Sequence, residues 1–313
     1  MKSPTPLFLS FLVASFLLIP FAQGASLGGV GGKPANPDLD DGETDQWFVY
    51  NLAPGESVED ELLVDNSTDQ TVIVKLYPAD STPSTDGGFA LDQEVESRDD
   101  VGAWVTLSQT GLTLGPRESV VVPFTLSVPD DPSLDVGEHA GGILIQPVVE
   151  NVDQGGIQLQ LRTGVRIYVT LPGAVVEDMS FSEFSVDLSK PDFVGARVSI
   201  TNEGNTSEDI SLVLNAVPAW PWMGELLKSY PVEVERSLQV LRDSSLTSSF
   251  ELPRPFFGVL NVSAEVSYDD GAETLSTETK RVWVFPAGEE LKILVLTLFF
   301  LFTFTLFLIF RRR

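Results

Sequence analysis

The residue types that most often perform catalysis are scarce in this sequence. Its 313 residues include a single histidine, His139, and no cysteine. A Ser-His-Asp triad would depend on His139, which lies in Gly137-Glu-His-Ala-Gly-Gly142, before a strand expected to begin at Ile143. The glycines of this segment are typical of backbone geometry, not of a catalytic site. We expect no catalytic residue, no metal centre and no cofactor, and the chain is predicted not to be an enzyme.

Carboxylates are abundant, but their spacing favours turns. The segment Asp38–Asp45 offers hard oxygen ligands for calcium, yet it departs from the EF-hand spacing. A solvated acidic linker is the favoured interpretation, and calcium binding is the alternative. The pairs Asp99-Asp100, Asp130-Asp131 and Asp269-Asp270 stand at expected turns, where Asp is favoured for local hydrogen bonding. These pairs do not predict a glycosidase.

Two groups of residues are candidates for binding. The first alternates with apolar residues along an expected strand: Gln158, Gln160, Arg162 and Arg166. Period-two alternation puts such residues on one polar face, where arginine forks suit carboxylates. The second is the pair Trp220 and Trp222, in a loop after a strand. Exposed rings there would stack on sugars or contact a membrane interface, whereas packing beneath the loop is the alternative.

The elements that must position these residues are strands. From Trp47 onward apolar and polar residues alternate, as in Thr71–Tyr77, Ser119–Pro129 and Ile157–Leu171. Short turn signals such as Pro54-Gly55 separate the runs. Outside the two ends no sustained helical period occurs, although Met223–Lys228 suits a short helical turn. The pattern predicts half-buried antiparallel strands and a β-sandwich fold.

The pattern starts again after Leu171-Pro172-Gly173. The run around Asn202–Thr206 parallels the run around Asn66-Ser67-Thr68 in the first half, and a last strand is expected at Lys280–Phe285. We predict an all-β fold of two tandem Ig-like β-sandwiches, the first over residues 45–174 and the second over residues 175–287.

The N-terminus has the three parts of a secretory signal. Lys2 precedes an apolar run from Leu7 to Phe21, and small residues follow at Ala22-Gln23-Gly24. We therefore expect a signal peptide over residues 1–24, cleaved after Gly24. Residues 25–44 are rich in Gly, Pro and Asp, which predicts a disordered arm.

The C-terminus has the pattern of a membrane anchor. The predicted transmembrane helix covers residues 291–310, which are nearly free of charge and long enough to cross the hydrocarbon layer. A basic tail, residues 311–313, follows at once, whereas Glu289 and Glu290 precede the helix. The positive-inside bias then places the tail in the cytoplasm and the two sandwiches outside the cell, in a single-pass arrangement.

The overall charge narrows the class of partner. The formal net charge is −26, with 45 acidic and 19 basic residues. Such a surface repels nucleic acid and anionic polymers, so we expect no nucleic-acid partner. An exported chain without cysteine must be held together by its core, which favours a bacterial surface protein over a small disulfide-rich ectodomain.

Several motifs resemble a known family in their order along the chain. In the first half they are Phe48–Ser57, Asp65–Thr71, Leu114–Ser119, Val128-Pro129, Gly137–Ile143 and Arg166–Gly173. This half resembles the Ig-like peptidoglycan-binding domain of WxL-interacting proteins, which share the plan of signal peptide, two sandwiches, membrane helix and basic tail. The second half is similar to membrane-proximal Ig-like domains of bacterial surface proteins, through Asn202–Thr206, Pro253–Gly258 and Val282–Pro286.

The resemblance implies a cell-surface protein whose first sandwich binds peptidoglycan. We expect a non-catalytic, membrane-anchored binding or scaffolding protein that engages the cell envelope or other surface proteins. A purely structural spacer of a surface assembly is one alternative. An envelope enzyme or protease regulator is another, although the chain offers no defensible pair of nucleophile and base.

Overall fold

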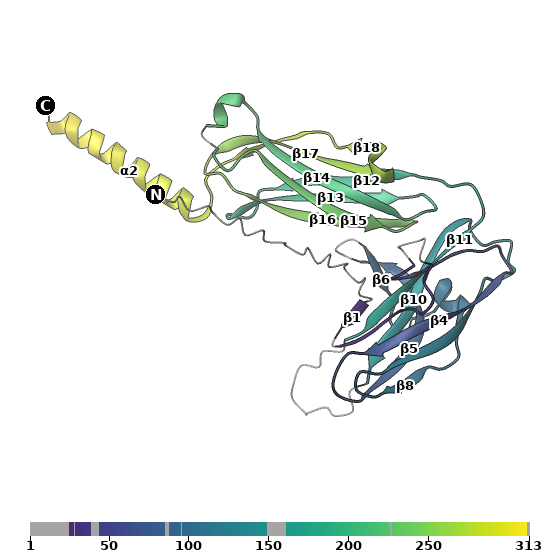
Figure 1. Ribbon diagram of the computed structural model, residues 1–313. Coiled ribbons are helices and arrows are strands. Elements are labelled where there is room, and N and C mark those ends of the chain that lie inside the picture. Colours follow the sequence, from purple (N-terminus) through teal and green to yellow (C-terminus); the bar gives the residue numbers. More distant parts are fainter. Residues whose placement is uncertain are drawn as a thin grey trace, which may run out of the picture.

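The computed structural model describes residues 25–27, 29–38, 44–84, 88–94, 96–148, 161–225 and 227–311. Within these ranges the chain forms two β-sandwiches in tandem, followed by one long helix (Figure 1). The predicted all-β fold class is therefore confirmed. The signal peptide, most of Asp38–Asp45, Gln158, Gln160 and the last two arginines lie outside the described residues.

The first sandwich packs two sheets face to face. One has the order β1-β2-β4-β9-β7, and the other has the order β3-β11-β10-β5-β6, with β8 pairing to β5. Their strands are β1 (Ala25–Leu27), β2 (Val30–Pro34), β3 (Phe48–Asn51), β4 (Ser57–Asn66), β5 (Val72–Pro83), β6 (Phe89–Leu91), β7 (Val105–Leu107), β8 (Gly111–Leu114), β9 (Ser119–Ser127), β10 (Gly137–Pro147) and β11 (Thr163–Leu171). The described pairs are antiparallel apart from β3 and β11, which run parallel.

Period-two alternation places the first core between these sheets. On β9 the side chains of Val122, Phe124 and Leu126 are buried, whereas the residues between them are exposed or half-buried. On β11 every second residue from Thr163 to Leu171 is buried. These inward residues pack against Ile143 and other side chains of the facing sheets. The residues that alternate with them, including Arg166, therefore face outward.

The prediction of a disordered arm over residues 25–44 is wrong for its first part. Residues 30–34 form β2, which pairs antiparallel with β4, and Val30 is buried in the first core. The glycines that suggested disorder allow close packing here, because a Cβ at Gly32 would lie 2.4 Å from Ile145 Cδ1. The segment covers the edge of β4, whose backbone groups need partners.

The second sandwich repeats the plan with different strand order. One sheet is β12-β13-β16, and the other is β15-β14-β17-β18, with β19 pairing to β17. The strands are β12 (Met179–Asp187), β13 (Phe193–Asn202), β14 (Glu208–Pro218), β15 (Val232–Val240), β16 (Ser244–Pro253), β17 (Gly258–Tyr268), β18 (Glu273–Ser276) and β19 (Lys280–Val284). The expected last strand at Lys280–Phe285 is confirmed to within one residue.

The predicted parallel between the two halves extends to one turn motif. Asn66 ends β4 and Asn202 ends β13. The side-chain amide of Asn66 donates to the carbonyl oxygen of Gln70 at 2.7 Å, and that of Asn202 donates to Thr206 at 2.7 Å. Both asparagines are buried. Each sandwich thus closes an equivalent strand with the same side-chain cap.

Helices are few in the described residues. The sequence analysis did not anticipate α1 (Val101–Trp104), which precedes β7. The short turn expected at Met223–Lys228 begins earlier, as the 3₁₀ helix η1 (Pro221–Met223), and a second 3₁₀ helix, η2 (Asp269–Gly271), occupies an expected turn.

The long helix α2 (Gly288–Arg311) begins three residues before the predicted span. It is long and apolar enough to cross a membrane, at about 1.5 Å per residue, and none of its residues is buried against the sandwiches. Figure 1 shows it leaving the end of the second sandwich that lies away from the first.

The burial of β2 generates a prediction about stability. Val30→Asp places a carboxylate in the core and should lower the free energy of unfolding of the first sandwich on the order of 3 kcal/mol. Urea unfolding followed by tryptophan fluorescence measures this. Val121→Asp is the matched control, because Val121 is 42% exposed on β9. Equal midpoints for both variants would show that β2 does not pack on the core.

Candidate functional site

The two sandwiches meet at the start of β10. The backbone N–H of Glu138 donates to the carbonyl oxygen of Asn205 at 2.8 Å. Gly137 has a φ of 103°, and a Cβ there would lie 2.2 Å from that same oxygen. Asn205 also holds the linker between the sandwiches, since its side chain bonds Ala174 and Val176 at 2.8 Å each. This contact leaves no space for a side chain at position 137.

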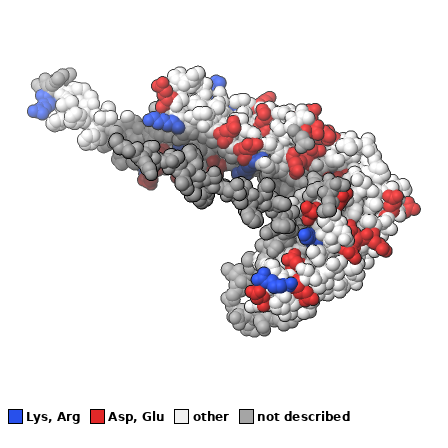
Figure 2. All heavy atoms as spheres, in the orientation of Figure 1, with Lys and Arg blue, Asp and Glu red and all other residues white. Residues whose placement is uncertain are grey.

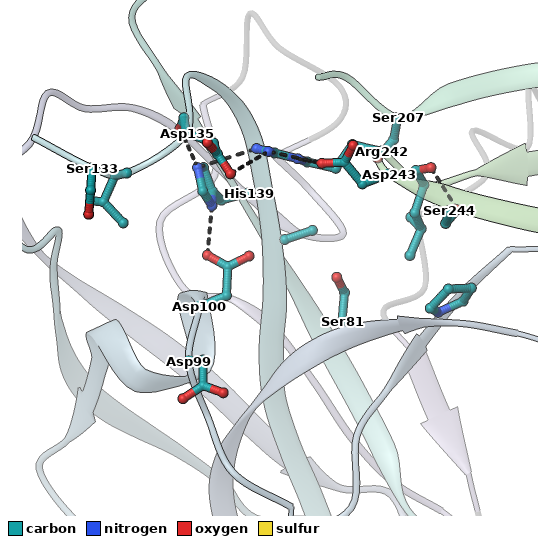
Figure 3. Close-up of a pocket in the computed structure, with 14 residues that line it drawn as sticks. Ser81, Asp99, Asp100, Ser133, Asp135, His139, Ser207, Arg242, Asp243 and Ser244 are labelled. Atoms are coloured by element: carbon teal, nitrogen blue, oxygen red, sulfur yellow. Dashed lines mark hydrogen bonds and ion pairs between the residues drawn. The ribbon is translucent and has the colours of Figure 1, made fainter. Parts of the chain in front are cut away.

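Arg242 extends this junction from the turn between β15 and β16. Its Nη1 donates to the carbonyl oxygen of Glu138 at 2.9 Å, and its Nη2 lies 3.6 Å from Asp135 and 3.3 Å from Asp243. The Arg242 side chain is only 17% exposed. Figure 3 shows it reaching toward His139, beside a pocket of about 410 Å³ lined by both sandwiches.

His139 lies inside β10, and not before the strand as expected, because β10 begins at Gly137. Its Nδ1 is 2.7 Å from Asp100 Oδ1, and its Nε2 is 2.8 Å from the carbonyl oxygen of Asp135 (Figure 3). The ring is buried and packs on Trp104, with centroids 5.0 Å apart. Both nitrogens are thus occupied, so the arrangement is one of structural support rather than of nucleophile activation.

The position of Asp100 is set by α1. The buried Asp80 carboxylate accepts hydrogen bonds from the backbone N–H groups of Asp99, Asp100 and Gly102, at 2.7, 3.2 and 2.6 Å. A Cβ at Gly102 would lie 2.5 Å from the Ala79 backbone. The short helix therefore sits tightly against β5, and this placement directs Asp100 toward His139.

The environment of His139 favours its charged form. Burial alone lowers the pKa of the ring, and the Arg242 charge acts in the same direction. The hydrogen bonds to Asp100 and to the Asp135 carbonyl, with the charge of Asp100, outweigh both and raise the pKa above its ordinary 6.5. An imidazolium ring donates from both nitrogens, which matches the two acceptors present.

A second part of the interface gathers around Arg166. Its guanidinium carbon lies 4.6 Å from the Phe89 ring centroid and 5.7 Å from that of Trp47. Its Nη1 donates to the Tyr168 hydroxyl at 3.2 Å. Tyr168 in turn contacts both rings, at centroid distances of 6.4 and 5.8 Å. Three aromatic rings from three separate segments therefore hold one cation.

This cluster forms one wall of a cleft between the sandwiches, which we call the interdomain cleft. It has a volume of about 710 Å³. The opposite wall comes from β14 and β15 and includes Asp209, Ile210 and Gln239. Glu138 also lines the cleft, and burial raises its pKa, although the Ser207 hydroxyl and backbone N–H and the Arg242 charge oppose the rise. The cleft thus combines aromatic rings, a guanidinium and polar side chains.

Only one of the described residues predicted to form a polar face along the expected strand, Arg166, lies in the cleft. Arg166 lines the cleft. Arg162 instead donates to the carbonyl oxygens of Leu91 and Asp92, at 2.8 and 2.9 Å. Arg162 therefore fastens the end of β6 to the sheet. Gln158 and Gln160 lie outside the described residues.

Trp220 and Trp222 lie elsewhere, at the α2 end of the second sandwich. Trp220 is half-buried and packs on the second core, whereas Trp222 is 67% exposed. The alternative of packing beneath the loop therefore applies to Trp220, and exposure applies to Trp222.

No group of three or more His, Asp or Glu side chains that could hold a metal ion occurs among the residues that the structure describes. Figure 2 shows acidic side chains spread over both sandwiches on the face displayed, with few basic ones. In the described part of the chain, Arg166 makes no ion pair with a carboxylate within 4.0 Å.

Arg242, Phe89 and Tyr168 were not singled out from the sequence. Tyr168 was accessible to that analysis, since period-two spacing puts it on the face of Arg166. Phe89 and Arg242 belong to segments distant in sequence, and no local pattern points to their contacts with β10 and β11.

Comparison with known proteins finds only distant structural similarity. No family model and no curated protein matches this chain. Similar solved structures include the E. coli chaperone DraB, with 14% identity over 83% of this chain and 99% of that chain at a TM-score of 0.35. The periplasmic chaperone SfaE has 10% identity over 81% of this chain and 98% of its own, with a TM-score of 0.36. A PapD-like domain of human CEP192 has 13% identity over 53% of this chain and 98% of its own, with a TM-score of 0.25. Identities and TM-scores this low support no statement about the function of this chain.

The raised pKa of His139 predicts a pH dependence of stability. Because the folded-state pKa lies above the ordinary 6.5, the stabilisation is complete below that pH and is lost as the pH rises through the folded pKa. Between pH 6 and 8.5 the unfolding temperature should fall, by roughly 2–4 °C for each kcal/mol lost. Differential scanning calorimetry of the full chain in detergent measures this. In His139→Gln the fall should largely disappear; an unchanged slope would assign the dependence to another group.

Proposed function

We propose that this chain is a non-catalytic, membrane-anchored surface protein that binds an envelope component in its interdomain cleft. The observation that carries the proposal is the cluster of Trp47, Phe89 and Tyr168 around Arg166, which lies in a cleft that both sandwiches line. Aromatic rings hold the guanidinium by cation–π contact and fix its plane. A fixed guanidinium is suited to bind a carboxylate through two parallel hydrogen bonds.

The chemistry of the cleft suits a ligand that carries both carboxylates and apolar or sugar surface. Peptidoglycan is our first candidate, because its peptide stems end in carboxylates and its glycan offers ring faces. The family resemblance of the first half supports the same choice. A carboxylate of a surface protein would use the same contacts and is the second candidate.

The acidic surface limits how such a ligand binds. With a net charge of −26, long-range electrostatics repel an anionic polymer. Binding must therefore rest on short-range contacts with Arg166, and it should weaken little as salt rises to about 0.15 M, where the Debye length is about 8 Å.

Membrane anchoring in this proposal rests on α2. The helix is long and apolar enough to span a bilayer, it follows the second sandwich directly, and Arg311 begins a basic end. We place the sandwiches outside the cell and the C-terminus in the cytoplasm, on the N-terminal signal pattern and the positive-inside bias.

Two alternatives account for less of the structure. A structural spacer needs two rigid sandwiches, but it does not need a cation held between aromatic rings in a cleft. An envelope enzyme would need a nucleophile and a base in contact, and the two ring nitrogens of His139 face Asp100 and the Asp135 carbonyl instead.

The proposal predicts that the full chain, in detergent, sediments with purified sacculi. Arg166→Gln should weaken this binding about tenfold or more, because hydrogen bonds to charged groups contribute about 1.5–3 kcal/mol. Arg166→Lys should also weaken it, since lysine keeps the charge but loses the planar fork. Circular dichroism checks that both variants are folded.

The matched control is Arg117→Gln, an exposed arginine of the first sandwich that pairs with Asp69 at 2.9 Å. It changes the net charge equally and should leave sedimentation unchanged. If the unmodified chain stays in the supernatant while a known wall binder sediments, peptidoglycan is the wrong ligand and a surface protein becomes the candidate. If both glutamine variants behave alike, the site is not at Arg166.

A further inference from the structure

An unusual aromatic surface lies at the α2 end of the second sandwich. Its rings contact one another in a continuous series: Trp222 to Trp220 at 6.1 Å, Trp220 to Trp283 at 6.0 Å, Trp283 to Phe285 at 6.5 Å and Phe285 to Phe257 at 5.7 Å. We call these five residues, with the adjacent Phe256, the aromatic collar.

The collar is exposed to an extent that requires an explanation. The exposed fractions are 67% for Trp222, 50% for Trp283, 55% for Phe285, 42% for Phe257 and 50% for Phe256. Three of the five tryptophans in the chain belong to it. A contiguous exposed apolar surface of this kind marks an interaction site, because contact of apolar side chains with water is unfavourable.

The collar is built from three separate segments that the fold holds firmly. The loop of Trp220 and Trp222 is anchored by Met223, which is 1% exposed in the second core. Trp283 lies on β19, which pairs with β17. The Phe285 carbonyl accepts a hydrogen bond from Arg254 Nη2 at 3.2 Å, and the same guanidinium bonds the carbonyls of Leu188 and Lys190.

The collar stands directly beside the start of α2. Only Pro286 and Ala287 separate Phe285 from Gly288, the first residue of the helix, so at most about 11 Å of extended chain lies between them. A Cβ at Gly288 would lie 3.2 Å from Pro191 Cβ, which places the helix start against the sandwich itself. If α2 crosses a bilayer, the collar is held at the height of the bilayer surface.

We propose that the aromatic collar docks into the headgroup region of the bilayer that α2 crosses, and so seats the second sandwich on the membrane. The inference rests on the membrane anchoring in the proposed function. Indole rings favour this region because they combine a large apolar face with a polar N–H group. Chain continuity supplies the partner, since the bilayer is the surface that α2 necessarily brings to the collar.

The test uses lipids that carry bromine on their acyl chains, which quench tryptophan fluorescence on contact. The full chain is reconstituted in phosphatidylcholine vesicles with unbrominated chains or with bromines near the headgroup end. The helix α2 contains no tryptophan, so any quenching must arise from the sandwiches. We expect about half of the emission to be quenched, because three of the five tryptophans lie in the collar.

Two variants assign the signal to the collar. Trp222→Phe together with Trp283→Phe should reduce the quenched fraction nearly twofold, from about three tryptophans of five to about one of three. The matched control is Trp104→Phe, which removes a tryptophan buried in the first sandwich. This variant loses emission that the lipid does not quench, so the quenched fraction of its total emission should rise and not fall. Circular dichroism confirms that each variant is folded.

The outcomes separate the collar from the anchor. If the chain does not float with the vesicles in a density gradient, the anchoring in the proposed function is wrong and the collar proposal falls with it. If the chain floats but brominated lipid quenches no emission, anchoring stands and the collar proposal is overturned, which leaves a sugar or protein surface as its partner. Equal quenching in the double variant and the unmodified chain would also overturn it.

Discussion

The rest of the molecule depends on one junction between the two sandwiches. There, Gly137 and His139 at the start of β10 meet the two turns that carry Asn205 and Arg242. The interdomain cleft has walls from both sandwiches, so it exists only while these walls keep their relative position. A backbone hydrogen bond from Glu138 to Asn205 and the half-buried Arg242 hold that position. The contact is polar and compact, which makes its geometry specific, because each donor must meet one particular acceptor.

The charge arrangement at this junction explains why a cysteine-free chain can keep two domains in a fixed relation. His139 bonds the Asp100 carboxylate and the backbone carbonyl of Asp135, and Arg242 lies 3.6 Å from the Asp135 carboxylate. Burial of the His139 ring limits the screening of its ion pair by salt. Removing Asp100 would leave the buried His139 ring without its carboxylate partner, and that is more costly than losing an exposed ion pair.

How much of this was accessible from the sequence depends on the range of the interaction. Alternation is local, so the strand around Val122–Leu126 and the outward direction of Arg166 were predictable from neighbours two residues apart. The long apolar helix α2 was predictable for the same reason. The packing of β2 was not, because the glycines at 31 and 32 resemble a disordered segment until the side chain of Ile145 is placed against Gly32.

The site was predictable only in part. Arg162 and Arg166 follow the same sequence pattern, yet one fastens β6 and the other lies between aromatic rings. The difference arises from Trp47, which precedes the edge strand β3, and from Phe89, which lies on β6 at the other edge of the sheet. Both reach Arg166 only in the folded chain. A pattern along one strand indicates which face a residue occupies, but partners from other strands decide what it does.

The length of β14 has a consequence for where this protein works. The strand begins at Glu208, and its next residues, Asp209 and Ile210, line the cleft. Its last residue, Pro218, leads into the aromatic loop at the other end. Eleven residues at about 3.3 Å each give roughly 36 Å. If α2 crosses a bilayer and the second sandwich stands upright on it, Arg166 lies several Debye lengths above the lipid charges. Phospholipid headgroups could not then compete for the guanidinium, and the cleft would sample only what occupies the envelope at that height.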